Sequence, residues 1–276
     1  MLENNSELSA KRIFDTFNSR AHKRFGQNFL FDKKINGKIV SAAGDLSDKV
    51  VVEVGPGAGG LTLEILKQNV KKLHLIEFDS HWVSVWNELK PKFGDHLNII
   101  HCDALKFDMN ELMPDVIISN LPYNISTQLL FRWMPNFHKY EMLVLMFQKE
   151  VADRICAAPK TKDYGKLSVL SQWKSSVKKV MELGPGSFFP SPKVRSSVIK
   201  FCPHQDIENI ILFEQLSRIL TDAFAQRRKI VAKALSKYFD NATEVLFELG
   251  YAPNTRAEEI SIEDYLKILM LFNNRL

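Results

Sequence analysis

The sequence has few cysteines and no arrangement of them that would bind a metal or build a disulfide framework. Its 276 residues include three cysteines, Cys102, Cys156 and Cys202, which lie far apart and form no CxxC pair and no Cys/His ligand spacing. We therefore expect neither a metal site nor a structural disulfide. This cysteine usage suits a reducing compartment.

Long apolar runs are also missing. No uninterrupted stretch approaches the roughly 20 residues that a membrane-spanning helix requires. The opening segment "MLENNSELSAKRIFDTFNSR" mixes acids with bases and has no apolar core of a signal peptide. We expect a cytoplasmic protein with no membrane partner. Hydrophobic residues at 45% and charged residues at 25% are ordinary for a globular chain.

The chain carries a modest positive charge of +5, and its bases gather in five clusters. Any one cluster is better explained as a solvated helix face. Several of them, however, lie beside aromatic residues, a combination that suits RNA phosphates and unstacked bases. Their closeness to the motifs below favours an RNA partner. The clusters are Arg20 to Arg24, Lys160 to Lys166, Lys174 to Lys179, Lys193 to Lys200 and Arg227 to Lys229.

From Lys49 onward, short apolar runs alternate with helical patterns. The runs are "KVVVEVG", "KLHLIEFD", "LNIIHCD", "DVIISNL" and "YEMLVLMFQ". Apolar strands that alternate with helices predict a parallel sheet covered on both faces. Two further runs, "VKKVMELG" and "VRSSVIKFC", follow with no helix between them, so we expect an antiparallel pair at the sheet edge. The predicted fold class is α/β, a Rossmann-like sheet of seven strands with the last pair antiparallel.

The pattern becomes wholly helical from about Asp206 to the end of the chain. We therefore divide the chain into three parts. Residues 1–20 are an N-terminal extension, residues 21–205 a Rossmann-like domain, and residues 206–276 a small all-helical domain expected to bind RNA.

A glycine-rich turn, "EVGPGAGGLT", ends the first expected strand and opens a helix. Gly55, Gly57 and Gly59 would let the backbone turn tightly and approach a ligand closely. Gly55, Gly57 and Gly60 also fit the GxGxxG fingerprint of NAD-binding proteins, which alone is a weak match. Pro56 lacks the N–H that a pyrophosphate would need, and this favours S-adenosylmethionine over NAD.

Acids end the second and third expected strands. Glu77 could accept hydrogen bonds from the ribose hydroxyls of a nucleoside, and Asp103 from an adenine amino group. Each could instead cap the following helix, an alternative that is stronger for Asp103 than for Glu77. Acids at two strand ends beside a glycine turn together predict a nucleoside cleft at the carboxyl edge of the sheet.

The stretch "SNLPYNIS" ends the fourth expected strand with a bare amide, a proline and an aromatic ring. A strand-to-helix turn would explain Asn and Pro. The side-chain oxygen of Asn120 and the backbone carbonyl of Leu121 could also hold the two N–H bonds of an exocyclic amine. These oxygens would stabilise the positive charge that develops on the nitrogen during methyl transfer. Tyr123 could stack on the base.

Seven ordered blocks resemble the small-subunit ribosomal RNA adenine N6,N6-dimethyltransferases, to which the macrolide-resistance methyltransferases are related. The blocks are "KRFGQNFL", "VEVGPGAGGLT", "NLPYNISTQLLF", "LMFQKEVADRI", "YGKLSVLSQ", "FFPSPKVRSSV" and "AFAQRRK". Three positions, Trp82, Gln128 and Arg195, depart from the usual pattern of the family.

The resemblance implies a methyltransferase that uses S-adenosylmethionine to dimethylate the N6 amine of two adjacent adenines near the 3′ end of small-subunit ribosomal RNA. It implies action as a monomer on an immature subunit, in ribosome biogenesis. The implied donor-binding residues are Asn28, Leu30, Gly55, Gly57, Glu77, Asp103 and Asn120; those at the target adenine are Asn120, Leu121, Tyr123 and Phe188; and those that bind RNA are Arg24, Arg227, Arg228 and Lys229.

Alternatives stay open at the level of sequence. Without the resemblance, Phe188 is equally well explained as core filling, and Gln27–Asn28 as a turn before a buried Phe29. The target could lie in large-subunit RNA, or the protein could act mainly as an assembly factor that binds. An NAD oxidoreductase is the third alternative, although the chain has no evident catalytic His or Tyr/Lys pair.

Overall fold

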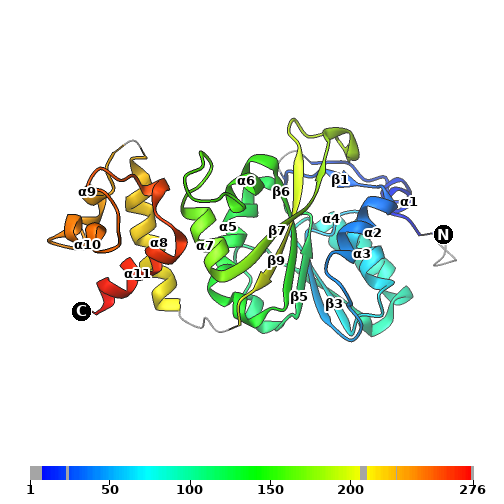
Figure 1. Ribbon diagram of the computed structural model, residues 1–276. Helices are drawn as coiled ribbons and strands as arrows, with labels where there is room; N and C mark the ends of the chain where they lie inside the picture. The colour runs from blue at the N-terminus through cyan, green and yellow to red at the C-terminus, as the bar shows by residue number, and fades with distance from the viewer. Residues whose placement is uncertain (1–7, 23–24, 206–209, 228, 275–276) are drawn as a thin grey trace.

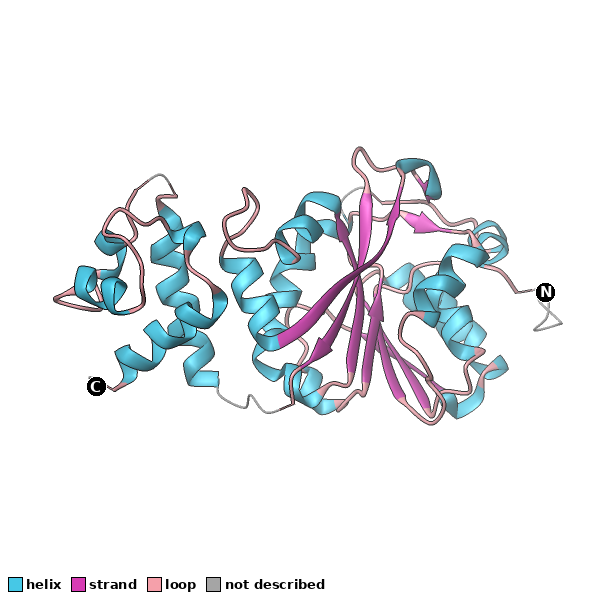
Figure 2. Ribbon diagram, viewed as in Figure 1, coloured by secondary structure: helices cyan, strands magenta, loops and turns pink. Residues whose placement is uncertain are grey.

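The computed structural model of the chain describes residues 8–22, 25–205, 210–227 and 229–274. Its centre is a seven-stranded sheet with the order β4-β3-β2-β5-β6-β9-β7 (Figures 1 and 2). The first five strands in this order are parallel, and β9 is antiparallel to both of its neighbours. The strands are β2 (Val50–Val54), β3 (Lys72–Glu77), β4 (Leu97–His101), β5 (Val116–Ser119), β6 (Met142–Gln148), β7 (Ser175–Leu183) and β9 (Ser196–Pro203).

The predicted fold class is confirmed. Each of the seven expected strands is present, and β7 and β9 form the antiparallel pair at one edge. The last strand along the chain, β9, is inserted between β6 and β7. As a result, the residue that begins β9, Ser196, lies opposite Gln148 on one side and Leu183 on the other.

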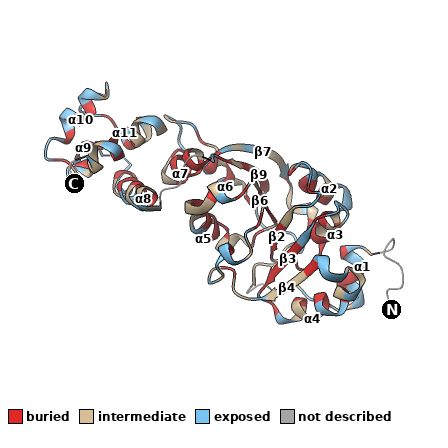
Figure 3. Ribbon diagram, turned by 90° about the horizontal axis from the view of Figure 1, so that it is seen from below, coloured by how far each residue is buried: buried red, intermediate tan, exposed pale blue. Residues whose placement is uncertain are grey.

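Helices cover both faces of the sheet, and consecutive strand residues point to opposite faces. In β5, Val116 and Ile118 pack with the helices of one face, whereas Ile117 packs with those of the other. Figure 3 shows the buried residues gathered along the central strands. One face carries α1 (Ala10–Thr16), α2 (Lys33–Ser41), α3 (Gly60–Leu66) and α4 (Ser80–Leu89); the other carries α5 (Tyr123–Trp133), α6 (Lys149–Ile155) and α7 (Lys166–Lys174).

Short 3-10 helices occupy several connections, namely η3 (Lys90–Lys92), η4 (Gly94–His96), η5 (Met109–Glu111), η6 (Met134–Lys139), η7 (Pro185–Ser187) and η8 (Ala257–Glu259). No helix within the described ranges is long and apolar enough to cross a membrane.

The C-terminal region is helical, as expected, and packs on α7 at the left of Figure 1. The rings of Trp173 and Phe213 stack there, with centroids 6.2 Å apart. Buried residues of this region belong to the same hydrophobic cluster as one face of the sheet. A separate domain that begins at residue 206 stays a prediction. The helices are α8 (Ile210–Ala225), α9 (Ala232–Leu235), α10 (Ala242–Glu248) and α11 (Ile262–Asn273).

A second, two-stranded sheet was not expected from the sequence. Here β1 (Phe29–Leu30) pairs with β8 (Phe188–Phe189) in antiparallel fashion. The N-terminal α1 packs against it, because the ring of Phe14 lies 5.2 Å from that of Phe29 and 5.7 Å from that of Phe189. The ring of Phe14 also lies 6.2 Å from that of Trp82. The N-terminal segment is thus tied to the segment that carries "QNFL".

Candidate active site

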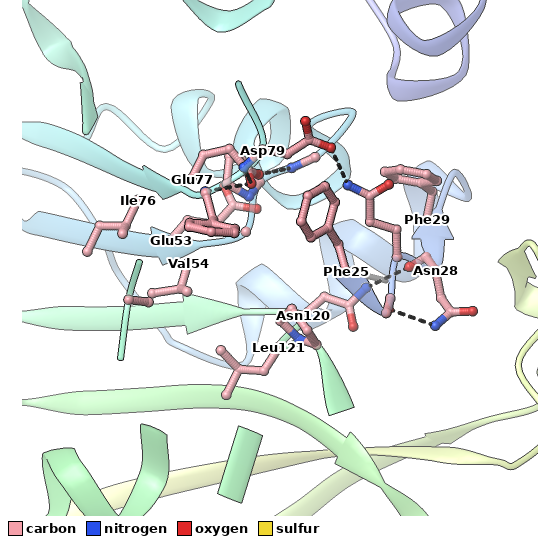
Figure 4. A pocket seen from close by; sticks show the side chains of 18 of the residues that line it. Phe25, Asn28, Phe29, Glu53, Val54, Ile76, Glu77, Asp79, Asn120 and Leu121 are labelled. Atoms are coloured by element: carbon pink, nitrogen blue, oxygen red, sulfur yellow. Dashed lines mark hydrogen bonds between the residues drawn. The ribbon is translucent and has the colours of Figure 1, made fainter. Parts of the chain in front are cut away.

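A cavity of about 400 Å³ opens at the carboxyl edge of the parallel strands, the edge where open α/β sheets bind ligands. It is lined by the ends of β2, β3 and β5, by the loop after β4 and by residues 25–31 (Figure 4). It brings together nine of the residues expected at the site: Asn28, Leu30, Gly55, Gly57, Glu77, Asp103, Asn120, Leu121 and Tyr123.

The glycine turn has the left-handed backbone that its sequence predicts. Gly55 has φ +69° and Gly57 has φ +48°. A Cβ on Gly57 would come within 2.8 Å of the ring of Phe29, a contact that folded proteins avoid. Glycine is therefore required at position 57 by both its backbone angle and its neighbour.

Two N–H groups of this turn, those of Gly55 and Gly57, are used within the protein. Gly55 donates to the carbonyl of Ile76 over 2.9 Å, and Gly57 donates to Oε2 of Glu77 over 3.4 Å. Pro56 has no N–H to give. A pyrophosphate binds to free backbone N–H groups at such a turn, and positions 55 to 57 offer it none.

Two buried carboxyls, those of Glu53 and Glu77, line the cavity. Oε1 of Glu77 accepts hydrogen bonds from the N–H groups of Phe78 and Asp79, both over 2.8 Å. Oε2 of Glu53 accepts one from the hydroxyl of Thr62 over 2.6 Å. Burial raises the pKa of Glu53 to about 8 and that of Glu77 to about 7, because desolvation disfavours the charged form of each.

The charged side chains around the cavity have one sign. Four acids line it, of which Glu53 is largely protonated at neutral pH because of its raised pKa, and the described lining residues include no lysine, arginine or histidine. Such a cavity attracts a cation and repels a phosphate. Within the described ranges there is also no cluster of His, Cys, Asp and Glu that could hold a metal ion. The four acids are Glu53, Glu77, Asp79 and Asp103.

The helix-cap alternatives for the two expected acids are wrong. Asp79, and not Glu77, caps α4 by accepting from the N–H of His81. No helix begins directly after Asp103; its Oδ1 accepts from the N–H of Leu105 over 3.0 Å and so stabilises a turn. Glu77 and Asp103 are thus at the cavity and not at helix starts.

Asn120 and Tyr123 reach the cavity from the end of β5 and the start of α5. The side-chain amide of Asn120 donates to the backbone carbonyl of Asn28 over 3.2 Å (Figure 4). Leu121 is buried and fixes the chain between them. The hydroxyl of Tyr123 makes a 2.5 Å hydrogen bond with Oγ of Ser196, and burial raises the pKa of this phenol.

The sequence did not lead us to expect Glu53 at the site, nor the hydrogen bond that holds the N-terminal loop at the cavity. An acid within the apolar run "VVEV" was a signal that could have identified Glu53. Gln27 donates from its side chain to Oδ2 of Asp79 over 2.8 Å, which no local pattern indicates. Phe25 and Phe78 form an edge-to-face pair at the cavity, with ring centroids 5.8 Å apart.

The other expected residues lie elsewhere. Phe188 is buried opposite Leu30 in the two-stranded sheet and is not among the residues that line the cavity. Arg227 and Lys229 are exposed in the helical region, and Nη2 of Arg227 donates to the carbonyl of Tyr164 over 2.6 Å. The expected positions 24 and 228 lie outside the described residues.

Comparison with known proteins identifies relatives over nearly the whole chain. The ribosomal RNA small subunit methyltransferase A of Wolbachia pipientis is 42% identical over 254 residues, which are 91% of this chain and 88% of that protein. The protein of the same name from Pelagibacter ubique is 40% identical over 255 residues, which are 91% and 96% of the two chains.

Solved structures agree with the sequence relatives. A dimethyladenosine transferase from Plasmodium falciparum matches with a TM-score of 0.78 and 28% identity, over 88% of this chain and 97% of that one. The 23S rRNA methyltransferase ErmE matches with a TM-score of 0.67 over 89% of this chain and 100% of that one, and at 21% identity it shares the fold. The fold is that of S-adenosylmethionine-dependent methyltransferases.

The family model described as ribosomal RNA adenine dimethylase matches residues 18–274. This match, the relatives and the cavity at the carboxyl edge agree: the chain belongs to the ribosomal RNA adenine dimethylase family.

Proposed function

We propose that the protein dimethylates the N6 amines of two adjacent adenines, in a loop near the 3′ end of small-subunit ribosomal RNA, with S-adenosylmethionine as methyl donor. Relatives about 40% identical are named small subunit methyltransferases, which supports the choice of RNA. When bound, the donor supplies a methyl carbon activated by a positively charged sulfur.

The choice of donor rests on the charge of the side chains that line the cavity. The described lining residues include four acids, of which Glu53 is largely protonated at neutral pH, and no basic side chain, and the donor is cationic whereas NAD carries a pyrophosphate. Glu77 and Asp103 would accept from the nucleoside, and the glycine turn would let the backbone approach it. Asn28, Leu30 and Asn120 would close the cavity from the other side.

Asn120 and Leu121 would position the target amine. Because the amide NH₂ of Asn120 is engaged by Asn28, the side-chain oxygen is the group that it can offer to an N6 hydrogen. The donor would supply the methyl group to the N6 lone pair and keep the electron pair of its carbon–sulfur bond, and N6 would then lose one proton to solvent. Neutral acceptors stabilise the charge that develops on N6, so no general base is required.

Tyr123 and Phe188 would hold the adenine ring between them. Tyr123 is at the cavity, whereas Phe188 is packed against Leu30, so in this proposal Phe188 must turn toward the base when RNA binds. Arg24, Arg227, Arg228 and Lys229 would contact RNA phosphates. We also propose that the protein acts in the cytoplasm as a monomer, on RNA within an immature subunit.

The test is methyl transfer by the purified protein to small subunits from cells that lack this modification, read by mass spectrometry of the RNA. We expect two dimethyladenosines in small-subunit RNA and none in large-subunit RNA. Asn120→Ala should lower the rate by about 10²- to 10³-fold, the range for the loss of one preorganised dipole. Methylation of large-subunit RNA instead, or full activity of Asn120→Ala, would contradict the proposal.

A further inference from the structure

We propose that Ser196 is a positioning residue for methyl transfer. Its hydroxyl fixes the ring of Tyr123 in the orientation that receives the target adenine. The inference rests on the proposed role of Tyr123, and it adds a residue from the antiparallel edge of the sheet to a site otherwise built on the parallel strands.

The contact joins two elements that are far apart in the sequence. Tyr123 begins α5, and its hydroxyl lies 2.5 Å from Oγ of Ser196, 73 residues later. The Tyr123 side chain has two rotatable bonds, and both of its ends are held: Cα by the start of the helix and the hydroxyl by Ser196. A ring held at both ends cannot swing away from the cavity.

Ser196 is itself held rigidly. It is fully buried and begins β9, where it pairs with Gln148 of β6 and with Leu183 of β7. The carbonyl of the preceding residue, Arg195, accepts from the N–H of Lys149 over 2.9 Å. The backbone of Ser196 is therefore paired with a neighbouring strand on each side, and this fixes the position of its hydroxyl.

The anchor matters because stacking depends on geometry. A stacking ring stabilises a base only when the two planes are aligned, and catalysis by positioning is lost steeply when a group moves by about 1 Å. Removal of the anchor would let the Tyr123 ring sample other orientations. This should lower the rate of the methyl-transfer step while donor binding is kept, since Ser196 is not among the residues that line the cavity.

The next residue in the strand provides a matched control. Ser197 is as fully buried as Ser196, lies on the same strand and is of the same type. Within the described part of the chain its hydroxyl has no hydrogen-bond partner. Ser197→Ala therefore removes the same atom from the same strand without removing a contact to Tyr123.

The experiment compares Ser196→Ala, Tyr123→Phe, the double variant and Ser197→Ala in methyl transfer to small subunits. We expect each of the first two to lower kcat by about three- to tenfold, the factor for one lost hydrogen bond. The double variant should lose no more than the single ones, since both remove the same bond. The Kd for S-adenosylmethionine, measured by calorimetry, should stay unchanged, and Ser197→Ala should match the wild type.

Tyr123→Phe tests the same bond from the other side, so a Ser196→Ala protein that fails to fold does not end the experiment. An active wild type with unchanged kcat in Ser196→Ala or in Tyr123→Phe would overturn the role of Ser196 and leave the proposed function intact. Additive losses in the double variant, or an equal loss in Ser197→Ala, would overturn it as well. A wild type that transfers no methyl group overturns both proposals.

Discussion

The side-chain amide of Asn120 donates a hydrogen bond to the backbone carbonyl of Asn28 over 3.2 Å. The contact joins the end of β5 to the segment that enters β1, 92 residues apart. It also settles the orientation of the amide, because the NH₂ group faces Asn28 and leaves the carbonyl oxygen for another donor. The residue that would hold the target amine is thus oriented by a residue that would hold the methyl donor.

Replacement of Asn120 by aspartate should give an intermediate loss of activity. A carboxylate still accepts from an N6 hydrogen, but it cannot donate to the carbonyl of Asn28 and is repelled by it. We expect Asn120→Asp to lower kcat about tenfold, less than Asn120→Ala, which removes the acceptor too. Single-turnover rates on small subunits would measure this order. The exposed Asn110, outside the cavity, supplies Asn110→Ala as a control, and equal rates for Asn120→Ala and Asn120→Asp would contradict the acceptor role.

Gly57→Ala should abolish donor binding. Position 57 combines φ +48° with a neighbouring ring 2.8 Å from where the Cβ would lie, so the turn or Phe29 must move. Gly44 is the matched control, because it has φ +82° and nothing within 4 Å of its Cβ. Both variants should lower the melting temperature through backbone strain, of about 1 kcal/mol. Calorimetry should find a normal Kd for S-adenosylmethionine in Gly44→Ala and no binding in Gly57→Ala. A normal Kd in Gly57→Ala would show that donor binding does not depend on the tight turn at position 57.

The main sheet and the place of the cavity could be predicted because the signals are local. Runs such as "VVVEVG" and "DVIISNL" are short, rich in β-branched residues and bounded by turn residues, a local pattern typical of strands. Parallel strands bring their carboxyl ends to one edge. The acids Glu77 and Asp103 therefore had to lie near the glycine turn. The position of β9 between β6 and β7 could not be predicted from these local signals.

The contacts between distant segments could not be predicted. The strands β1 and β8 are two residues long each, and their pairing of Phe29 with Phe189 has no periodic pattern to indicate it. The same holds for the packing of Phe14 on this pair and for the hydrogen bond between Tyr123 and Ser196. These contacts depend on how the whole chain packs, which a local sequence window does not contain.

Stability should fall as pH rises because of Glu53. The folded state raises the pKa of this carboxyl from 4.5 to about 8, so it holds its proton where the unfolded chain has released it. The contribution of this bound proton to the free energy of unfolding is fully present below about pH 4.5 and is lost as pH rises through 8. Glu53→Gln keeps an acceptor for Thr62 and cannot ionise. Relative to the wild type, its free energy of unfolding should gain on the order of 3 kcal/mol between pH 5 and pH 8.

Chemical denaturation of both proteins across this pH range, without donor, measures the difference. Comparison with Glu53→Gln also cancels His74, whose pKa is lowered by burial and which acts in the opposite direction. Parallel pH profiles for the two proteins would show that Glu53 ionises in the folded state as it does in the unfolded chain.

Replacement of Arg227 and replacement of Lys229 should have different effects on the stability of the protein, although both residues are expected to bind RNA. The guanidinium of Arg227 donates to the carbonyl of Tyr164, a fully buried residue just before α7, and so ties the helical region to the part of the chain that holds the sheet. Arg227→Ala should therefore lower the melting temperature, by about 2 °C, and also weaken RNA binding. Lys229→Ala should weaken RNA binding alone.

Binding to small-subunit RNA at several salt concentrations separates the two effects. A side chain that contacts a phosphate contributes about one unit to the slope of log affinity against log salt concentration. We expect Lys229→Ala to lower this slope by about one unit with an unchanged melting temperature. If Arg227→Ala lowers the melting temperature but keeps the full slope, the Arg227 guanidinium has a structural role and Lys229 makes the phosphate contact. If neither variant changes the slope, residues 227 and 229 are not part of the RNA interface.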